Sequence, residues 1–222
     1  MQLMRSHENT IIRMQDRVNK LIEDFGEYVD IFDQAKLFTG PSLYFHFKTM
    51  EIRRQHSSAS LALKDDSFIE SVYATLTAWG MHRMGPGNTK LAEFKELKYS
   101  FMKQSDRIQK VESFHICKIE KQNIYQIIPL IWDIISNLQV GVGKTKIVAG
   151  SKALHHLLPD LVPPIDREYT IRFFLHNTTL SQGDEKAFKD IYPYFHEIAI
   201  SCQDEISSRI GKGMNTSISI PN

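Results

Sequence analysis

Apolar residues recur at helical spacing along most of the chain. Between residues 4 and 37 they stand three or four positions apart, which predicts one or two amphipathic helices. A polar Asp-Asp-Ser run at 65–67 can cap a further helix that ends at Gly80. The same pattern predicts helices over about 89–104, 106–118, 122–137, 145–158, 166–176 and 185–208.

Three stretches interrupt this pattern. Residues 38–56 contain the turn signal Gly40-Pro41 and are expected to form a loop or short irregular segment, whose basic end is a candidate phosphate contact through Arg53, Arg54 and His56. Residues 81–90 are expected to form a loop, and residues 211–222 a flexible tail. No stretch shows a clear alternation of apolar and polar residues with period two, the pattern that is typical of β-strands. The pattern therefore predicts an all-α, two-lobed helical domain of about eight helices over residues 1–210.

Composition limits the classes of function. The 222 residues are 42% hydrophobic and 24% charged, enough for a buried core. The formal net charge is +1, so nucleic-acid binding would require a local basic patch. Two distant cysteines exclude a four-cysteine cluster and indicate a reducing compartment. No apolar run approaches the roughly 20 residues of a membrane span, so we expect a cytoplasmic protein with no membrane partner.

A glycine-rich turn is predicted between two helices at residues 138–150. Gly141 and Gly143 lie between a helix ending near Asn137 and another starting near Lys144. Glycines let the backbone approach an external oxygen, and a helix start carries partial positive charge, so this turn can hold a phosphate. Many helix connections use glycine only for a positive φ. Lysines add positive charge around the turn and valines are expected to anchor it in the core: Lys144, Lys146, Lys152, Val140 and Val142.

An aspartate follows at the start of the next helix. Three prolines stiffen the link after residue 158, and Ile165 then precedes Asp166. An aspartate in this place is also an ordinary helix N-cap. The two roles are compatible, because one carboxylate can both cap its helix and face a substrate.

The order of these features resembles the helix-hairpin-helix DNA glycosylase superfamily, in which LPGVG is followed by a helix and by a (V/I)D pair that opens the next helix. The match covers about 35 of the 222 residues. It implies that Asp166 is the catalytic aspartate and that the hairpin binds the DNA backbone through Gly141, Gly143, Lys144, Thr145 and Lys146. The chain departs from the pattern in three ways: Val140 replaces the family proline, the interval to the aspartate is longer, and LHHLLPDL is inserted before the prolines.

The resemblance implies a DNA glycosylase that flips a damaged or modified base out of double-stranded DNA and hydrolyses its N-glycosidic bond. The carboxylate of Asp166 would stabilise the positive charge that develops on the sugar. Strand-cutting members carry a lysine two positions after the second glycine, where this chain has Thr145, so a monofunctional enzyme is expected. The cysteine count excludes the iron–sulfur cluster of some relatives, and we expect a monomer without cofactor or metal.

An extruded base needs aromatic faces around it and a residue that fills the gap it leaves. The candidates are Trp79, His82, Arg83, Tyr44, Phe45 and Tyr169. Trp79 is equally well explained as a core residue beneath a turn. His155 and His156 are not expected to bind a metal, because neighbouring helical positions point about 100° apart and no second ligand pair follows. One of them is expected to pack and the other to face DNA or solvent. The acidic pairs at 184–185 and 204–205 are expected on solvated helix surface.

The sequence leaves two other functions open. A non-catalytic helix-hairpin-helix module would bind duplex DNA through the glycines and would not need Asp166. In an all-α interaction protein, the Gly-Val-Gly turn and Asp166 would be only a turn and a cap. The sequence does not identify which base the enzyme would remove. Repair of alkylated, oxidised or deaminated bases is the default, and removal of modified bases from viral DNA is the alternative.

Overall fold

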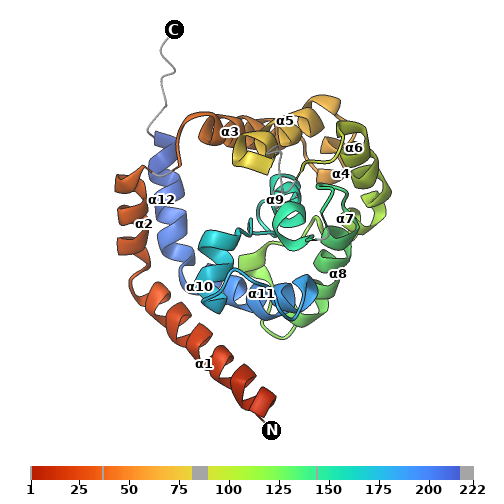
Figure 1. The fold of residues 1–222 in the computed structure, drawn as a ribbon. Helices are drawn as coiled ribbons and strands as arrows, with labels where there is room; N and C mark the ends of the chain where they lie inside the picture. Colours follow the sequence, from red (N-terminus) through yellow and green to blue (C-terminus); the bar gives the residue numbers. More distant parts are fainter. Residues whose placement is uncertain (1, 37, 82–89, 144, 216–222) are drawn as a thin grey trace.

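The structure is a computed structural model that describes residues 2–36, 38–81, 90–143 and 145–215. Among these residues the regular secondary structure is helical and no strand is present, which confirms the prediction of an all-α protein (Figure 1). The α-helices are α1 (Gln2–Glu23), α2 (Phe25–Ala35), α3 (Gly40–Arg54), α4 (Ala59–Ala62), α5 (Asp66–Leu76), α6 (Phe94–Lys103), α7 (Ser105–Val111), α8 (Ile124–Asn137), α9 (Ile147–Leu157), α10 (Arg172–Leu175), α11 (Asp184–Ser201) and α12 (Gln203–Asn215). Short helical turns are η1 (Thr77–Met81), η2 (Ile116–Lys118) and η3 (Arg167–Ile171).

The expectation of a loop at 38–56 is wrong. Helix α3 begins at Gly40, whose φ of 63° is in the left-handed region, and Pro41 stands in its first turn. Proline is favoured there, because its fixed φ suits a helix and its missing N–H would have no partner in the helix. The Gly-Pro pair is thus the start of a helix and not a turn between other elements.

The described residues contain more helices than the expected eight. The stretch 4–37, for which one or two helices are expected, forms two that meet at Asp24. The predicted helix at 185–208 is interrupted at Cys202, and the helix at 40–54 is an additional one. The two-lobed arrangement stays a prediction. No described helix is long and apolar enough to cross a membrane.

Helix α9 lies at the centre of the fold and packs against α3, α5, α8 and α11 (Figure 1). Its buried side chains include apolar ones such as Leu154 and also the polar Ser151 and His156, all fully buried. Gly150 faces α8 so closely that a Cβ at this position would lie 2.8 Å from the Ile135 carbonyl oxygen. Because α9 is enclosed on several sides, its polar side chains are held in fixed places.

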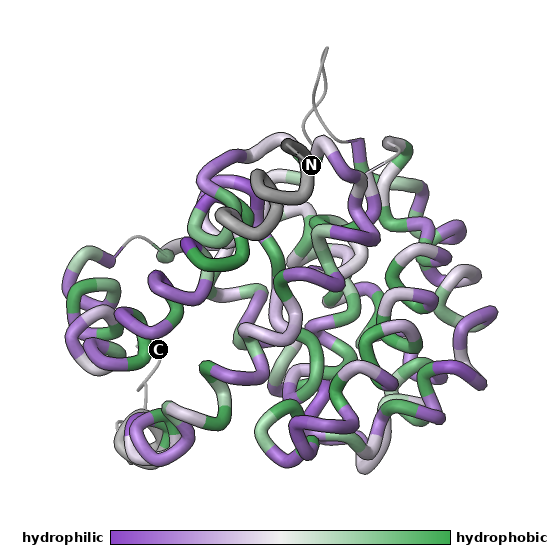
Figure 2. The backbone as a smooth tube through the Cα atoms, turned by 90° about the horizontal axis from the view of Figure 1, so that it is seen from below, coloured by the Kyte–Doolittle hydropathy of each residue, from purple (hydrophilic) through white to green (hydrophobic). Residues whose placement is uncertain are grey.

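Hydrophilic stretches lie mostly along the outer helical turns, and hydrophobic stretches mostly toward the inside (Figure 2). Helix α2 is different, because none of its residues is buried. It is held to α12 by Arg209, which bonds to Asp30 Oδ1 at 2.7 Å and to the Gly26 carbonyl oxygen at 3.0 Å. Exposed apolar side chains remain on α2, among them Phe32, which is 52% exposed.

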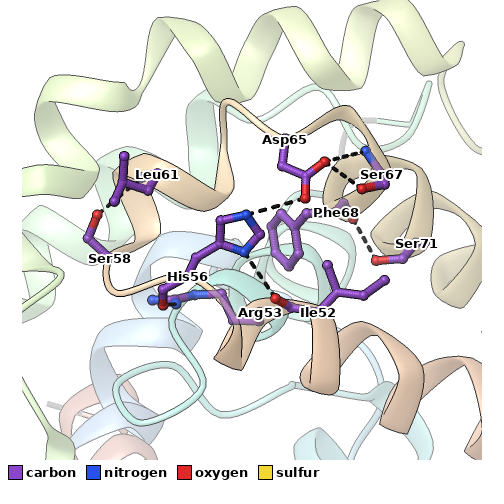
Figure 3. A network of polar contacts seen from close by, with 9 residues as sticks. All are labelled: Ile52, Arg53, His56, Ser58, Leu61, Asp65, Ser67, Phe68 and Ser71. Carbon is purple, nitrogen blue, oxygen red and sulfur yellow. Dashed lines mark hydrogen bonds and ion pairs between the residues drawn. The ribbon is translucent and has the colours of Figure 1, made fainter.

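A polar network joins the end of α3 to the start of α5 (Figure 3), and Arg53 extends it to α9. Arg53 donates to the carbonyl oxygens of Leu157 at 2.7 Å and His56 at 3.0 Å. His56 in turn donates through Nδ1 to the Ile52 carbonyl oxygen, and its Nε2 lies 3.2 Å from Asp65. The guanidinium of Arg53 therefore binds two carbonyl groups of the protein itself, and its contact with phosphate stays a prediction.

The close approach of α9 to α8 is testable by adding one methyl group. We expect Gly150→Ala to lower the free energy of unfolding by about 1–3 kcal/mol, because its Cβ would meet the backbone of Ile135. Gly143→Ala is the control, since nothing lies within 4 Å of its Cβ position, and a change within about 0.5 kcal/mol is expected. Urea unfolding measures both. Alanine normally stabilises a helix interior relative to glycine, so a Gly150→Ala protein more stable than the parent would contradict this packing.

Candidate active site

A cavity of ≈ 860 Å³ opens among α3, η1, α9 and η3. Its volume lies within the range of about 300–1,000 Å³ that is usual for small-molecule sites. Aromatic rings form part of its wall, and polar side chains form another part. A second, smaller cavity of ≈ 570 Å³ among α1, α8 and α11 contains none of the residues selected from the sequence.

The larger cavity brings together three residues selected from the sequence: Trp79, Asp166 and Tyr169. Tyr169 is 75% exposed and lies at the rim. Tyr44 and Phe45 on α3 do not line this cavity, and Tyr44 is 60% exposed. The remaining candidates for the base pocket, His82 and Arg83, lie outside the described residues.

Asp166 is positioned by the residue before it and by the helical turn after it. Ile165 is fully buried, and its N–H donates to Ser151 Oγ of α9 at 3.0 Å. Asp166 Oδ1 then accepts from the N–H groups of Glu168 at 2.8 Å and Tyr169 at 3.4 Å. The expected N-cap role of Asp166 is confirmed, and the cap turns the carboxylate toward the cavity.

The other carboxylate oxygen of Asp166 forms an ion pair with Lys152 of α9. Asp166 Oδ2 and Lys152 Nζ are 2.7 Å apart, and the lysine side chain is only 11% exposed. Lys152 Nζ also lies 5.7 Å from the centre of a Trp79 ring, within the range of a cation–π contact. Partial burial acts to raise the pKa of Asp166, but the hydrogen bond and charge of Lys152 and the two backbone N–H groups outweigh it, so this pKa lies below its ordinary value.

Three histidines of α3 and α9 contact one another next to the cavity. His46 of α3 lies parallel to His155 of α9, with ring centres 5.9 Å apart and an interplanar angle of 8°. His46 also contacts His156, with 3.2 Å between His46 Nδ1 and His156 Nε2. His156 is fully buried, whereas His46 and His155 line the cavity. The expectation that one of the adjacent histidines packs is confirmed, and the other faces a cavity.

The hydrogen bonds fix the protonation of the three rings. His156 Nδ1 is 2.8 Å from the Lys152 carbonyl oxygen, and His155 Nδ1 is 2.8 Å from that of Val162. Carbonyl oxygens only accept, so both Nδ1 atoms carry the proton, and the bare Nε2 of neutral His156 accepts from Nδ1 of His46. Burial is the main reason that the pKa falls to about 4 for His46 and to about 3 for His156, and it also lowers the pKa of His155.

The predicted DNA-binding hairpin is tied to a neighbouring segment. The Ala92 N–H donates to the Val140 carbonyl oxygen, and the Val142 N–H to the Lys90 carbonyl oxygen, each at 2.9 Å. Val140 is buried as expected, but the expectation that Val142 is anchored in the core is wrong, because Val142 is 71% exposed. This pairing engages the N–H group of Val142 and leaves its side chain exposed.

The start of α9 already holds a carboxylate. Asp184 Oδ2 accepts from the N–H groups of Lys146 and Ile147, so Asp184 is a cap and not free helix surface, contrary to the expectation from sequence. Thr145 Oγ1 accepts from the exposed guanidinium of Arg167 at 3.1 Å. The N–H groups of Lys146 and Ile147 are therefore already occupied by Asp184. Lys144 lies outside the described residues.

No protein-family model matches the chain, and neither a curated protein nor a solved structure matches it. Among the described residues, no group of three or more histidine, cysteine, aspartate or glutamate side chains is arranged to hold a metal ion.

The histidine cluster makes stability depend on pH. The unfolded chain takes up protons on its histidines near pH 6.5, whereas His46 and His156 are expected to stay neutral in the folded protein until about pH 4 and about pH 3. The unfolded state then binds more protons, so stability is full above pH 6.5 and falls as the pH drops, by up to about 1.4 kcal/mol per pH unit for each histidine. A long-range ¹H–¹⁵N NMR titration measures these rings directly. Rings of both residues that titrate near pH 6.5 in the folded protein would contradict the burial described above.

Proposed function

We propose that this protein is a DNA glycosylase that hydrolyses the N-glycosidic bond of a damaged or modified base flipped out of duplex DNA. One observation carries the proposal: the carboxylate of Asp166, whose pKa is lowered, lies in the wall of a cavity with aromatic rings and room for a nucleobase. The resemblance of the hairpin and aspartate order to helix-hairpin-helix glycosylases adds to it. The proposal includes the two-lobed helix-hairpin-helix arrangement and duplex DNA as the partner.

In the proposed reaction the bond between C1′ and the base nitrogen breaks, and its electron pair leaves with the base. The sugar becomes positively charged, and a carboxylate near C1′ stabilises this charge. Water then adds to C1′ through its oxygen, and its proton passes to Asp166 or to solvent while the departing base gains a proton. A carboxylate has about four acceptor positions. Asp166 uses three, for Lys152, Glu168 and Tyr169, so one remains for the attacking water.

Lys152 has a positioning role in this reaction. A nearly buried ammonium is stable only beside a negative charge, so Lys152 keeps Asp166 ionised and holds one carboxylate oxygen in place. Damaged bases in the cell's own DNA are the default substrates. The exposed Gly143, with Thr145 and Arg167, supplies the proposed phosphate contact.

The catalytic role of Asp166 is tested by Asp166→Asn. Asparagine can still cap the turn η3, but it lacks the charge, so we expect the rate of base release to fall about 100-fold or more. Asp65→Asn is a matched control, because Asp65 caps α5 in the same way, accepting from Ser67 N at 2.9 Å, and lies outside the cavity. Mass spectrometry of bases released from DNA carrying alkylated, oxidised, deaminated and natural modified bases measures both variants. A folded Asp166→Asn protein that releases bases as fast as the parent would sink the proposal.

A second activity, cutting of the strand after base removal, is favoured by one observation. Thr145 occupies the position of the family lysine, but Lys152 places a different amine 2.7 Å from Asp166. After passing a proton to Asp166, the amine nitrogen could attack C1′ of the aldehyde sugar, and loss of water would give an imine. Removal of a C2′ proton would then expel the 3′ phosphate. This route competes with the monofunctional reaction that the sequence predicts.

Borohydride trapping separates the two possibilities. If Lys152 forms the imine, reduction of a mixture with abasic DNA will give a stable covalent complex, and Lys152→Arg will abolish it. If the enzyme is monofunctional, the wild-type protein will release bases without any trapped complex. The same variant reports the positioning role, because the guanidinium of arginine retains the positive charge beside Asp166.

A further inference from the structure

The proposed reaction leaves His46 and His155 without a function, although both line the cavity. Each has its Nδ1 proton directed into the protein, toward His156 Nε2 and the Val162 carbonyl oxygen respectively. In the neutral ring the remaining nitrogen, Nε2, has no proton and can only accept a hydrogen bond. The two side chains therefore offer a ligand two acceptors.

Both Nε2 atoms are open to a ligand. Among the described residues, Arg17 Nε is the only buried side-chain nitrogen or oxygen that has no hydrogen-bond partner. His46 Nε2 and His155 Nε2 have no hydrogen bond with any described group, so they are not among the buried atoms. Because both residues line the cavity, it is the cavity that these nitrogens can reach.

The neighbouring polar groups on this wall have their protons engaged. Ser42 Oγ donates to the Ala78 carbonyl oxygen at 2.9 Å, and Trp79 Nε1 donates to the Ser42 carbonyl oxygen at 3.1 Å. Free donors lie elsewhere, on Lys152 beside Asp166 and on Tyr169 at the rim. The part of the wall that holds Ser42, His46 and His155 thus accepts hydrogen bonds and does not donate them to a ligand.

The two rings lie close enough together for one amino group to contact both. An NH₂ nitrogen whose two protons point about 120° apart holds two acceptors about 5 Å from one another when each hydrogen bond is about 2.9 Å long. The parallel rings of His46 and His155 have their centres 5.9 Å apart. Two donors on adjacent ring positions, as on the edge of a guanine, point in nearly the same direction and would need closer acceptors.

We propose that His46 and His155 form an amino clamp, which binds the exocyclic amino group of a base and makes the site select adenine-type or cytosine-type bases over their keto counterparts. The inference rests on the proposed function for the way in which the base enters the cavity. It names the class of base, which the sequence left open. A keto oxygen in the same place would face two lone pairs, an unfavourable contact in a partly desolvated site.

The amino clamp is tested by binding of free bases, which needs no bond cleavage. The probes are the pairs adenine and hypoxanthine, and cytosine and uracil, titrated at pH 7.5 into isotopically labelled protein and followed by NMR. We expect each amino base to bind about tenfold more tightly than its keto partner. In His46→Phe and His155→Phe the preference should fall to about twofold or less, because phenylalanine keeps a ring but has no acceptor. His115→Phe, outside the cavity, is the control and should keep the preference.

Long-range ¹H–¹⁵N spectra of the wild-type protein supply a second readout that does not depend on variants. They should show both rings neutral and protonated at Nδ1. Protonation at Nε2 in either ring, equal binding of amino and keto bases, a preference that survives both phenylalanine variants, or no binding of any base would overturn the amino clamp. The proposed function fails on a different result, an active Asp166→Asn protein, so the two failures are distinguishable.

Discussion

The ion pair between Lys152 and Asp166 joins the most enclosed helix of the fold to the turn that follows the proline-rich link. A lysine that is only 11% exposed needs a negative partner, and Asp166 is that partner at 2.7 Å. Helix α9 also fixes the residue before the aspartate, through the bond from Ile165 N to Ser151 Oγ. The position of the carboxylate is therefore set by the packing of α9 against α3, α5, α8 and α11.

The same helix divides the cavity into two chemical regions. In one region Lys152 and Asp166 supply a pair of opposite charges, and in the other His46 and His155 supply neutral acceptors. Lys152 belongs to both regions, because its ammonium contacts Asp166 and its carbonyl oxygen accepts a hydrogen bond from His156 Nδ1. In the proposed reaction the carboxylate of Asp166 acts on the sugar, and His46 and His155 bind the base.

Much of the fold and part of the site could be predicted from the sequence. The period of the apolar residues gave the all-α class, and the motif around Asp166 identified a carboxylate that caps its turn and lines a cavity with Trp79 and Tyr169. The helical period and the cap are local features, so a linear pattern contains them.

The residues that the sequence did not reveal depend on contacts between distant segments. Because 38–56 was expected to be a loop, nothing indicated that Ser42 and His46, four positions apart, share one face of a helix. Lys152 and His155 are three positions apart on α9, so they share one face of this helix. The sequence did not indicate that this face borders a cavity. The cap from Asp184 to α9 spans 38 residues, and no local signal records it.

The central claim is that Asp166 stabilises positive charge on a sugar in the cavity. It is tested most directly by the affinity for duplex DNA in which one nucleotide is replaced by a pyrrolidine ring, which is positively charged, or by an uncharged tetrahydrofuran ring. The account predicts that the wild-type protein binds the pyrrolidine duplex at least about tenfold more tightly, a difference of about 1.4 kcal/mol, and that Asp166→Asn removes the difference. Equal affinities of the wild-type protein for the two duplexes would contradict it.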